Sequence, residues 1–142
     1  MLLLSKGADP NKAAKHRDGS VAITPLYRAV SAGSTKVVQS FLASGADPNK
    51  ENNSTIGGVQ CTVHVSTPLY RAVWFRYTEI VRSLLESKAD PNKGYRKTDK
   101  DGNVTVETPL FMAAGRGHNE VVTSLLERGA RQDLDTGGGE LG

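Results

Sequence analysis

Few residues in this chain of 142 residues have side chains suited to catalysis or metal binding. The histidines are His16, His64 and His118, and the single cysteine forms the spacing Cys61-x-x-His64. On a strand, residues with this spacing point to opposite faces, and no second pair completes the ligand set of a zinc site. We therefore expect no metal, no cofactor and no catalytic residue.

Patterns that could bind phosphate are also weak. The glycines at 137–139 lack the lysine and the following helix that phosphate-binding loops use. The segment 96–101 alternates in charge sign, which is typical of a solvated loop tip. The whole chain carries 18 basic and 15 acidic residues, without the clustered basic stripe of nucleic-acid-binding proteins. These observations argue against an enzyme and against nucleic acid as the partner.

The composition fits one ordinary domain. Hydrophobic residues make up 37% of the chain, and no segment approaches the roughly 18 consecutive apolar residues that cross a membrane. One cysteine cannot form an internal disulfide, which argues against a disulfide-stapled secreted protein. We expect an intracellular, cytoplasmic monomer that does not associate with membranes.

The chain contains an internal repeat. Thr-Pro-Leu begins each of the blocks 24–50, 67–93 and 108–134, which align without a gap. The first two blocks share 17 identical residues. The motif Ala-Asp-Pro-Asn-Lys ends both of them and also occurs at 8–12. Three blocks of this similarity predict three copies of one structural unit.

Each block is predicted to form two short helices. Threonine caps a helix well, and proline is tolerated at its first position. Residues 26–30 carry apolar side chains at i, i+3 and i+4, and residues 37–42 form a second, wider apolar stripe. Gly33 and Gly45 fall where each helix needs a left-handed end. One such pair cannot bury its own apolar face, but stacked neighbours can.

These motifs resemble the ankyrin repeats, through Thr-Pro-Leu-Tyr-Arg-Ala, Gly117-His118, Leu-Leu-Glu and Gly-Ala-Asp-Pro-Asn. The resemblance implies a mainly α solenoid of stacked helix-turn-helix repeats, with β-hairpin fingers projecting at one edge. We expect a single array whose ends look truncated. The partial repeat at 1–12 lacks its first helix, and the segment after the third block contains no capping helix. Its expected parts are the end of a truncated repeat at 1–12, helix pairs at 24–50, 67–93 and 108–134, fingers at 13–23, 51–66 and 94–107, and a flexible tail at 135–142.

The segments between the blocks are longer than the family pattern. Gly57-Gly58 and Asp101-Gly102 each precede a run in which valines alternate with polar residues, a strong signal for a β-hairpin. We predict long fingers that lie side by side as an antiparallel sheet, each with one apolar and one polar face. The valines either join neighbouring fingers or contribute to a partner site.

The blocks also depart from the family in their residues. Tyr27, Tyr70 and Phe111 replace the usual histidine, whose role in the family is structural, so the change concerns packing. In the middle block, Arg76 and Lys88 replace both glycines.

The resemblance implies that certain positions of the first helix face a concave groove and vary with the partner. Arg71 lies one turn before Trp74 and Phe75, and such side chains are frequent anchors of protein interfaces. Alternatively, Trp74 fills core space beside the missing glycine. The expected partner-binding residues are Arg71, Trp74, Phe75, Arg28, Met112 and Arg116.

The sequence therefore predicts a non-catalytic scaffold that binds another protein through its concave groove and its fingers. An alternative is a regulatory or substrate-recruiting segment of a larger enzyme, channel or ligase, whose intramolecular partner would use the same groove. A third alternative is a small anionic ligand or an oligonucleotide bound by Arg28, Arg71 and Arg116.

Overall fold

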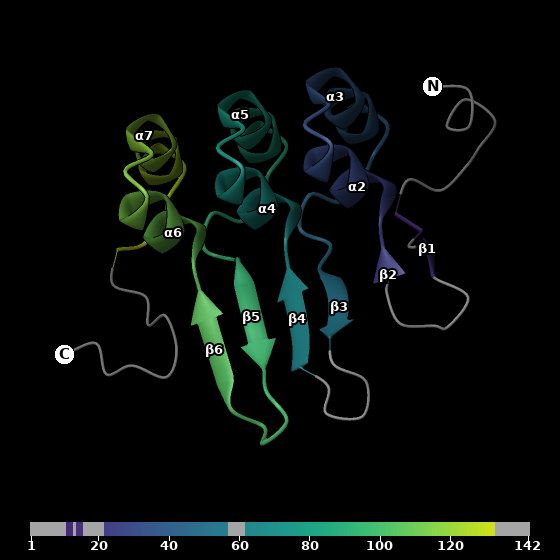
Figure 1. Ribbon diagram of the computed structural model, residues 1–142. Helices are drawn as coiled ribbons and strands as arrows, with labels where there is room; N and C mark the ends of the chain where they lie inside the picture. Colours follow the sequence, from purple (N-terminus) through teal and green to yellow (C-terminus); the bar gives the residue numbers. More distant parts are fainter. Residues whose placement is uncertain (1–10, 13, 16–21, 57–61, 133–142) are drawn as a thin grey trace.

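The computed structural model describes residues 11–12, 14–15, 22–56 and 62–132, and it shows helix pairs stacked beside a sheet that extends away from them (Figure 1). The predicted helix-turn-helix repeats with long hairpins are confirmed. Most of the expected truncated repeat and the whole expected tail lie outside the described residues. Within the described part, no helix has the length and apolar character needed to cross a membrane.

Each repeat begins with a capped helix. The side chain of Thr24 accepts a hydrogen bond from the amide of Tyr27, and Thr67 and Thr108 do the same one repeat further on. Proline follows each threonine at the first helical position, where no amide hydrogen is needed. The helices are α2 (Pro25–Ser31), α3 (Thr35–Ala43), α4 (Pro68–Trp74), α5 (Thr78–Glu86), α6 (Pro109–Gly115) and α7 (Asn119–Glu127).

The helices form two rows. An inner row of α2, α4 and α6 lies nearest the sheet, and an outer row of α3, α5 and α7 packs behind it (Figure 1). Small residues such as Ala72 and Ala113 are fully buried in the inner row, which lets neighbouring helices approach closely. Leucines and valines from both rows fill the space between them, including Leu26, Leu69, Val81 and Leu84.

The fingers form one antiparallel sheet, as predicted, in the order of the sequence. The predicted Gly57-Gly58 turn lies outside the described residues. At the turn of the finger at 94–107, Gly102 has a φ of +83°. The Asp99 carboxylate accepts hydrogen bonds from Asn103 and from the Asp101 amide, and these bonds lower the pKa of Asp99. The strands are β1 (Ala14–Lys15), β2 (Ala22–Ile23), β3 (Asn52–Ile56), β4 (Thr62–Ser66), β5 (Tyr95–Thr98) and β6 (Val104–Glu107).

The expectation that each finger has one apolar and one polar face is wrong for the finger at 94–107. The register sets Arg96 of β5 between Val65 of β4 and Val106 of β6, so a cation interrupts the valine face. The alternation that predicted an apolar face occurs in β4 and β6, whereas β5 has no valine. Arg96 forms an ion pair with Glu51 at 3.3 Å, and the charge therefore stays compensated.

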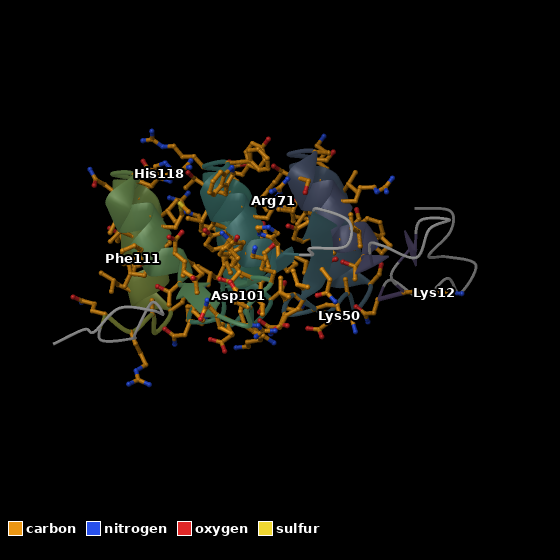
Figure 2. The ribbon with its side chains drawn as sticks, turned by 60° about the horizontal axis from the view of Figure 1, so that its bottom comes forward. Lys12, Lys50, Arg71, Asp101, Phe111 and His118 are labelled. Carbon is orange, nitrogen blue, oxygen red and sulfur yellow. The ribbon has the colours of Figure 1, made fainter. Side chains whose placement is uncertain are left out.

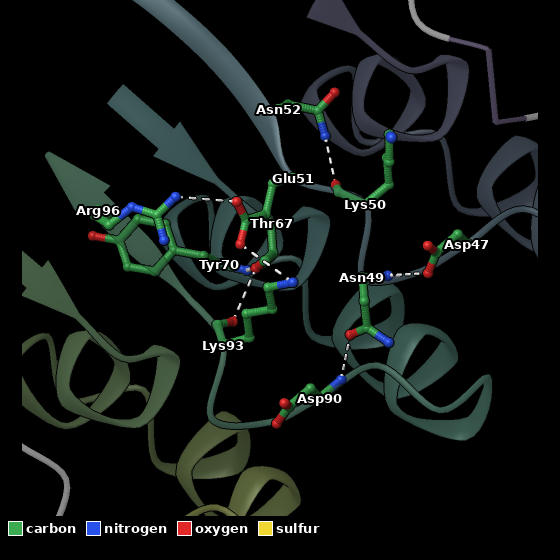
Figure 3. Close-up of polar contacts among 10 residues, drawn as sticks. All are labelled: Asp47, Asn49, Lys50, Glu51, Asn52, Thr67, Tyr70, Asp90, Lys93 and Arg96. Carbon is green, nitrogen blue, oxygen red and sulfur yellow. Dashed lines mark hydrogen bonds and ion pairs between the residues drawn. The ribbon is translucent and has the colours of Figure 1, made fainter. Parts of the chain in front are cut away.

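An asparagine joins each repeat to the next (Figure 3). The side-chain oxygen of Asn49 accepts a hydrogen bond from the Asp90 amide at 2.6 Å, and its amide group donates to the Lys88 carbonyl at 3.1 Å. The same pair of bonds joins Asn11 to Asp47 and Gly45, and Asn92 to Arg131 and Gly129. This ladder sets the spacing between neighbouring repeats.

The tyrosines that replace histidine provide a second link between repeats. The hydroxyl of Tyr27 lies 2.6 Å from the hydroxyl oxygen of Ser66, and Tyr70 donates a hydrogen bond to Glu107. Burial, and then this bond to a carboxylate, raise the pKa of Tyr70 well above its usual range. Phe111 has no hydroxyl and lies 53% exposed at one end of the stack, far from Lys12 (Figure 2). The tyrosines at this position therefore link repeats through their hydroxyl groups, whereas Phe111 cannot form such a bond.

Replacing the central asparagine of the ladder tests its contribution to stability. Asn49→Ala should lower the free energy of unfolding by about 1–2 kcal/mol. The exposed Asp90 amide and Lys88 carbonyl would lose their hydrogen bonds to the asparagine side chain and would bond to water instead. Denaturant unfolding measures the change. The exposed Asn53 of β3 has no side-chain hydrogen bond to a described residue, so Asn53→Ala should change stability by less than half as much. Equal losses would contradict the ladder.

The two residues that replace glycine keep the glycine conformation. Arg76 and Lys88 have φ values of +61° and +72°, and the equivalent of Lys88 in the first repeat, Gly45, has +94°. A left-handed backbone costs a non-glycine residue about 1–2 kcal/mol. The middle repeat therefore contains two strained helix ends.

Restoring glycine should relieve one of these strained ends. Lys88→Gly should raise the free energy of unfolding by about 0.5–1 kcal/mol, after the greater flexibility of glycine in the unfolded chain is subtracted. The reverse change, Gly45→Ala, should lower it by about 1 kcal/mol, because an added Cβ meets no atom within 4 Å and only the backbone is strained. Thermal or denaturant unfolding of both variants would show opposite signs, and the same sign in both would refute this account.

Candidate functional site

Two large apolar side chains lie exposed at the end of the middle inner helix. Trp74, the last residue of α4, is 40% exposed, and Phe75, its C-cap, is 38% exposed. Trp74 therefore does not fill the core, in contrast to the alternative considered from the sequence. With Arg71 and Arg116 they form what we call the inner-helix patch.

Arg71 stacks on the aromatic ring that follows it by one turn. Its guanidinium carbon lies 4.8 Å from the ring centroid of Phe75, and 5.8 Å from that of Tyr27. Its Nε donates a hydrogen bond to the hydroxyl of Ser31, at the end of α2, at 3.3 Å. One arginine thus connects the first repeat with the exposed ring of the second, as its spacing from Phe75 predicted.

The arginine that contacts Trp74 is Arg116, whereas the spacing along the sequence indicated Arg71. The guanidinium carbon of Arg116 lies 4.1 Å from the indole centroid, and its Nη1 donates to the Trp74 carbonyl at 3.2 Å. Arg116 is the C-cap of α6, so it reaches back from the third repeat to the second. The stack brings the two side chains together across 42 residues of sequence.

Tyr77, which supports Phe75, was not among the residues predicted from the sequence. The ring of Tyr77 stacks on that of Phe75, with centroids 5.3 Å apart and planes inclined by 23°. Tyr77 also packs against Gly33 of the first repeat, where an added Cβ would lie 2.9 Å from the tyrosine Cζ. The aromatic run at 74–77 was the signal, but the contact with Gly33 appears only in the folded stack.

Of the remaining predicted contact residues, Arg28 is exposed and Met112 is buried. Arg28 is exposed on α2, at the position equivalent to Arg71. Met112, at the same position of α6, is only 8% exposed and belongs to the core, so the expectation that it faces a partner is wrong. Burial of the flexible, uncharged thioether of methionine stabilises the fold, whereas an arginine at this position keeps its guanidinium in water.

A second cluster, also missed from the sequence, lies where the inner row meets the sheet. The rings of Tyr70 and Tyr95 stack with centroids 5.3 Å apart, and the Tyr95 hydroxyl lies 2.6 Å from Nδ1 of His64. Burial, with the nearby Glu107 carboxylate, raises the pKa of Tyr95. These residues come from two repeats, and they fix the fingers against the helices.

Comparison with known proteins agrees with this architecture. A family model described as ankyrin repeats in three copies matches residues 1–95, and a single ankyrin repeat model matches residues 107–136. The chain belongs to the ankyrin repeat family. Ankyrin repeats are in general protein–protein interaction modules and are typically non-catalytic.

Among solved structures, the chain resembles the crystal structure of an ankyrin repeat domain from Acinetobacter baumannii AYE. The two are 30% identical with a TM-score of 0.63, over 92% of this chain and 57% of the bacterial one. The chain thus spans little more than half of that ankyrin repeat domain. No curated protein matches the sequence.

The Gly-His turn of the last ankyrin repeat places a histidine in the interior. His118, which precedes α7, is 7% exposed, and its Nδ1 has no hydrogen-bond partner among the described residues. Burial lowers the pKa of His118, and the positive charges of Arg76 and Arg116 lower it further, while a hydrogen bond to the backbone of Val73 opposes them. The ring is therefore neutral at pH 7.

This histidine makes the stability of the stack depend on pH. In the unfolded chain His118 takes up a proton as the pH falls through its usual pKa of about 6.5, before the folded form does. The free energy of unfolding should therefore be highest above pH 6.5 and should fall as the pH decreases below about 6.5. Denaturant unfolding above and below this pH measures the loss, which His118→Gln should reduce. An unchanged loss in that variant would assign the pH dependence to other groups.

Proposed function

We propose that this chain is a non-catalytic scaffold that binds another protein through the inner-helix patch and the adjoining finger surface. The family resemblance implies that these inner-helix positions face a concave groove, and this implication supports the proposal. The carrying observation is the pair of exposed aromatic rings, Trp74 and Phe75, each stacked with an arginine. Tryptophan and arginine are enriched among the residues that dominate binding energy at protein interfaces.

Rigid presentation of these side chains favours binding. Arg71 is fixed by Ser31 and Phe75, Arg116 by Trp74, and Phe75 by Tyr77. Side chains that are ordered before association lose less conformational entropy on binding. The asparagine ladder fixes the helices beneath them in the same way. We propose that the partner shares an intracellular compartment with this chain.

Removing both rings tests the proposal. Trp74→Ala with Phe75→Ala should abolish capture of the partner from a cell extract, because the two largest exposed anchors are lost. Helical circular dichroism should stay unchanged, since both rings lie on the surface. Loss of helical signal would instead show that the rings are needed for folding, and undiminished capture would refute the proposal.

A matched variant controls for the loss of exposed apolar surface. Phe111→Ala with Leu126→Ala removes side chains that are 53% and 39% exposed at the end of the stack, outside the inner-helix patch. This variant should still capture the partner. If this variant loses capture while Trp74→Ala with Phe75→Ala keeps it, the end of the stack is the binding surface and the inner-helix patch is not.

A further inference from the structure

We infer that the partner of the inner-helix patch is an extended acidic segment, with carboxylates presented to the arginines of successive repeats. The inference rests on the proposed function and adds the chemistry of the partner to it. It starts from the charge of the inner row, which differs from that of the outer row.

The inner row carries cations and no carboxylate. The segments 24–34, 67–77 and 108–118, which contain α2, α4 and α6 with their turns, have no aspartate or glutamate. The same segments carry four arginines, namely Arg28, Arg71, Arg76 and Arg116. The acidic residues within the described helices lie on the outer row, for example Glu79 on α5 and Glu120 on α7.

Within the described residues, no carboxylate forms an ion pair with these arginines. Among the residues that the structure describes, the ion pairs are Arg82–Glu120, Lys93–Glu51 and Arg96–Glu51, all outside the inner row. Glu107, which directly precedes the third of these segments, accepts the hydrogen bond of the Tyr70 hydroxyl. The inner row therefore presents uncompensated positive charge although the net charge of the whole chain is only +3.

The two arginines that lie over aromatic rings retain donors that a carboxylate could use. A guanidinium that stacks face-on against a ring keeps the donors at its edge available for bidentate bonds to an anion. Arg71 uses its Nε toward Ser31, and Arg116 uses one Nη toward Trp74, so each retains further N–H groups. Each ring thus supports a cation whose remaining donors are unpaired within the described structure.

The spacing of the repeats suits an extended peptide. Neighbouring packed helices lie about 8–10 Å apart, and an extended chain advances about 3.3 Å per residue. One acidic residue in about every three would therefore meet one inner helix after another. Apolar residues between them can contact the exposed edges of Trp74 and Phe75.

The same surface is less suited to single-stranded nucleic acid. Base recognition on such strands uses free aromatic faces for stacking. The ring of Phe75 already packs against both Arg71 and Tyr77, and Arg116 covers the indole of Trp74. The rings support the arginines instead of offering platforms to bases.

The chain contains its own reporter for a binding test. Trp74 is the single tryptophan, so its fluorescence reports events at the inner-helix patch. The probe is a synthetic ten-residue peptide with glutamate at every third position and leucine and glycine between. It should change the Trp74 emission with saturation, and the apparent affinity should fall as sodium chloride is raised. The same peptide with glutamine in place of glutamate should bind at least tenfold more weakly.

Paired arginine variants locate the binding. Arg71→Gln with Arg116→Gln should weaken binding of the glutamate peptide at least tenfold, because two charge-assisted contacts are lost. Arg82→Gln with Arg128→Gln removes the same charge from the outer row and should leave the affinity within about twofold. Unchanged thermal unfolding of both variants establishes that the fold is intact.

Several outcomes would overturn the inference. These are no binding of the glutamate peptide, equal binding of the glutamine peptide, equal losses in the two arginine variants, or tighter binding of a ten-nucleotide oligothymidylate. If any of them occurs while Trp74→Ala with Phe75→Ala still abolishes capture of a protein, the acidic partner is wrong and the proposed function remains. If that aromatic variant captures its partner normally, the proposed function itself fails.

Discussion

The hydrogen bonds that one asparagine makes with the backbone of the following repeat hold the described repeats at a constant spacing. Asn49 accepts from the Asp90 amide and donates to the Lys88 carbonyl, and Asn11 and Asn92 repeat the arrangement. Because the bonds are made to backbone atoms, they fix the distance between repeats regardless of the side chains around them. The apolar faces of the helix pairs then meet in the same register each time, and the core forms between the two rows.

That constraint accounts for the strained helix end at Lys88 in the middle repeat. Its two helix ends keep positive φ values at Arg76 and Lys88, although a glycine would adopt them with less strain. The Lys88 carbonyl is the acceptor for Asn49, so the chain must turn there in the same way as at Gly45. The stack maintains the backbone conformation while the residue type varies, and the side chain of Arg76 is exposed beside the inner-helix patch.

The same spacing brings the proposed binding residues together. Arg71 extends toward the first repeat, and Arg116 extends from the third repeat toward the second, so the patch is made of contacts between repeats. The long fingers add a sheet that Tyr27 and Tyr70 attach to the inner row through their hydroxyl groups. A surface built in this way is ordered before a partner arrives, which suits recognition by a rigid scaffold.

The sequence by itself determined the repeat, the capped helices, the long hairpins and the stacking of Arg71 on Phe75. Each of these depends on residues close in sequence or on motifs that recur in phase. It could not determine that Trp74 pairs with Arg116, that Tyr77 supports Phe75 against Gly33, that Met112 is buried, or that Arg96 interrupts the valine face. Those outcomes depend on which side chains the neighbouring repeat places within a few ångströms, and no spacing along one repeat contains that information. Local periodicity therefore predicted the units, and packing between the units decided the surface.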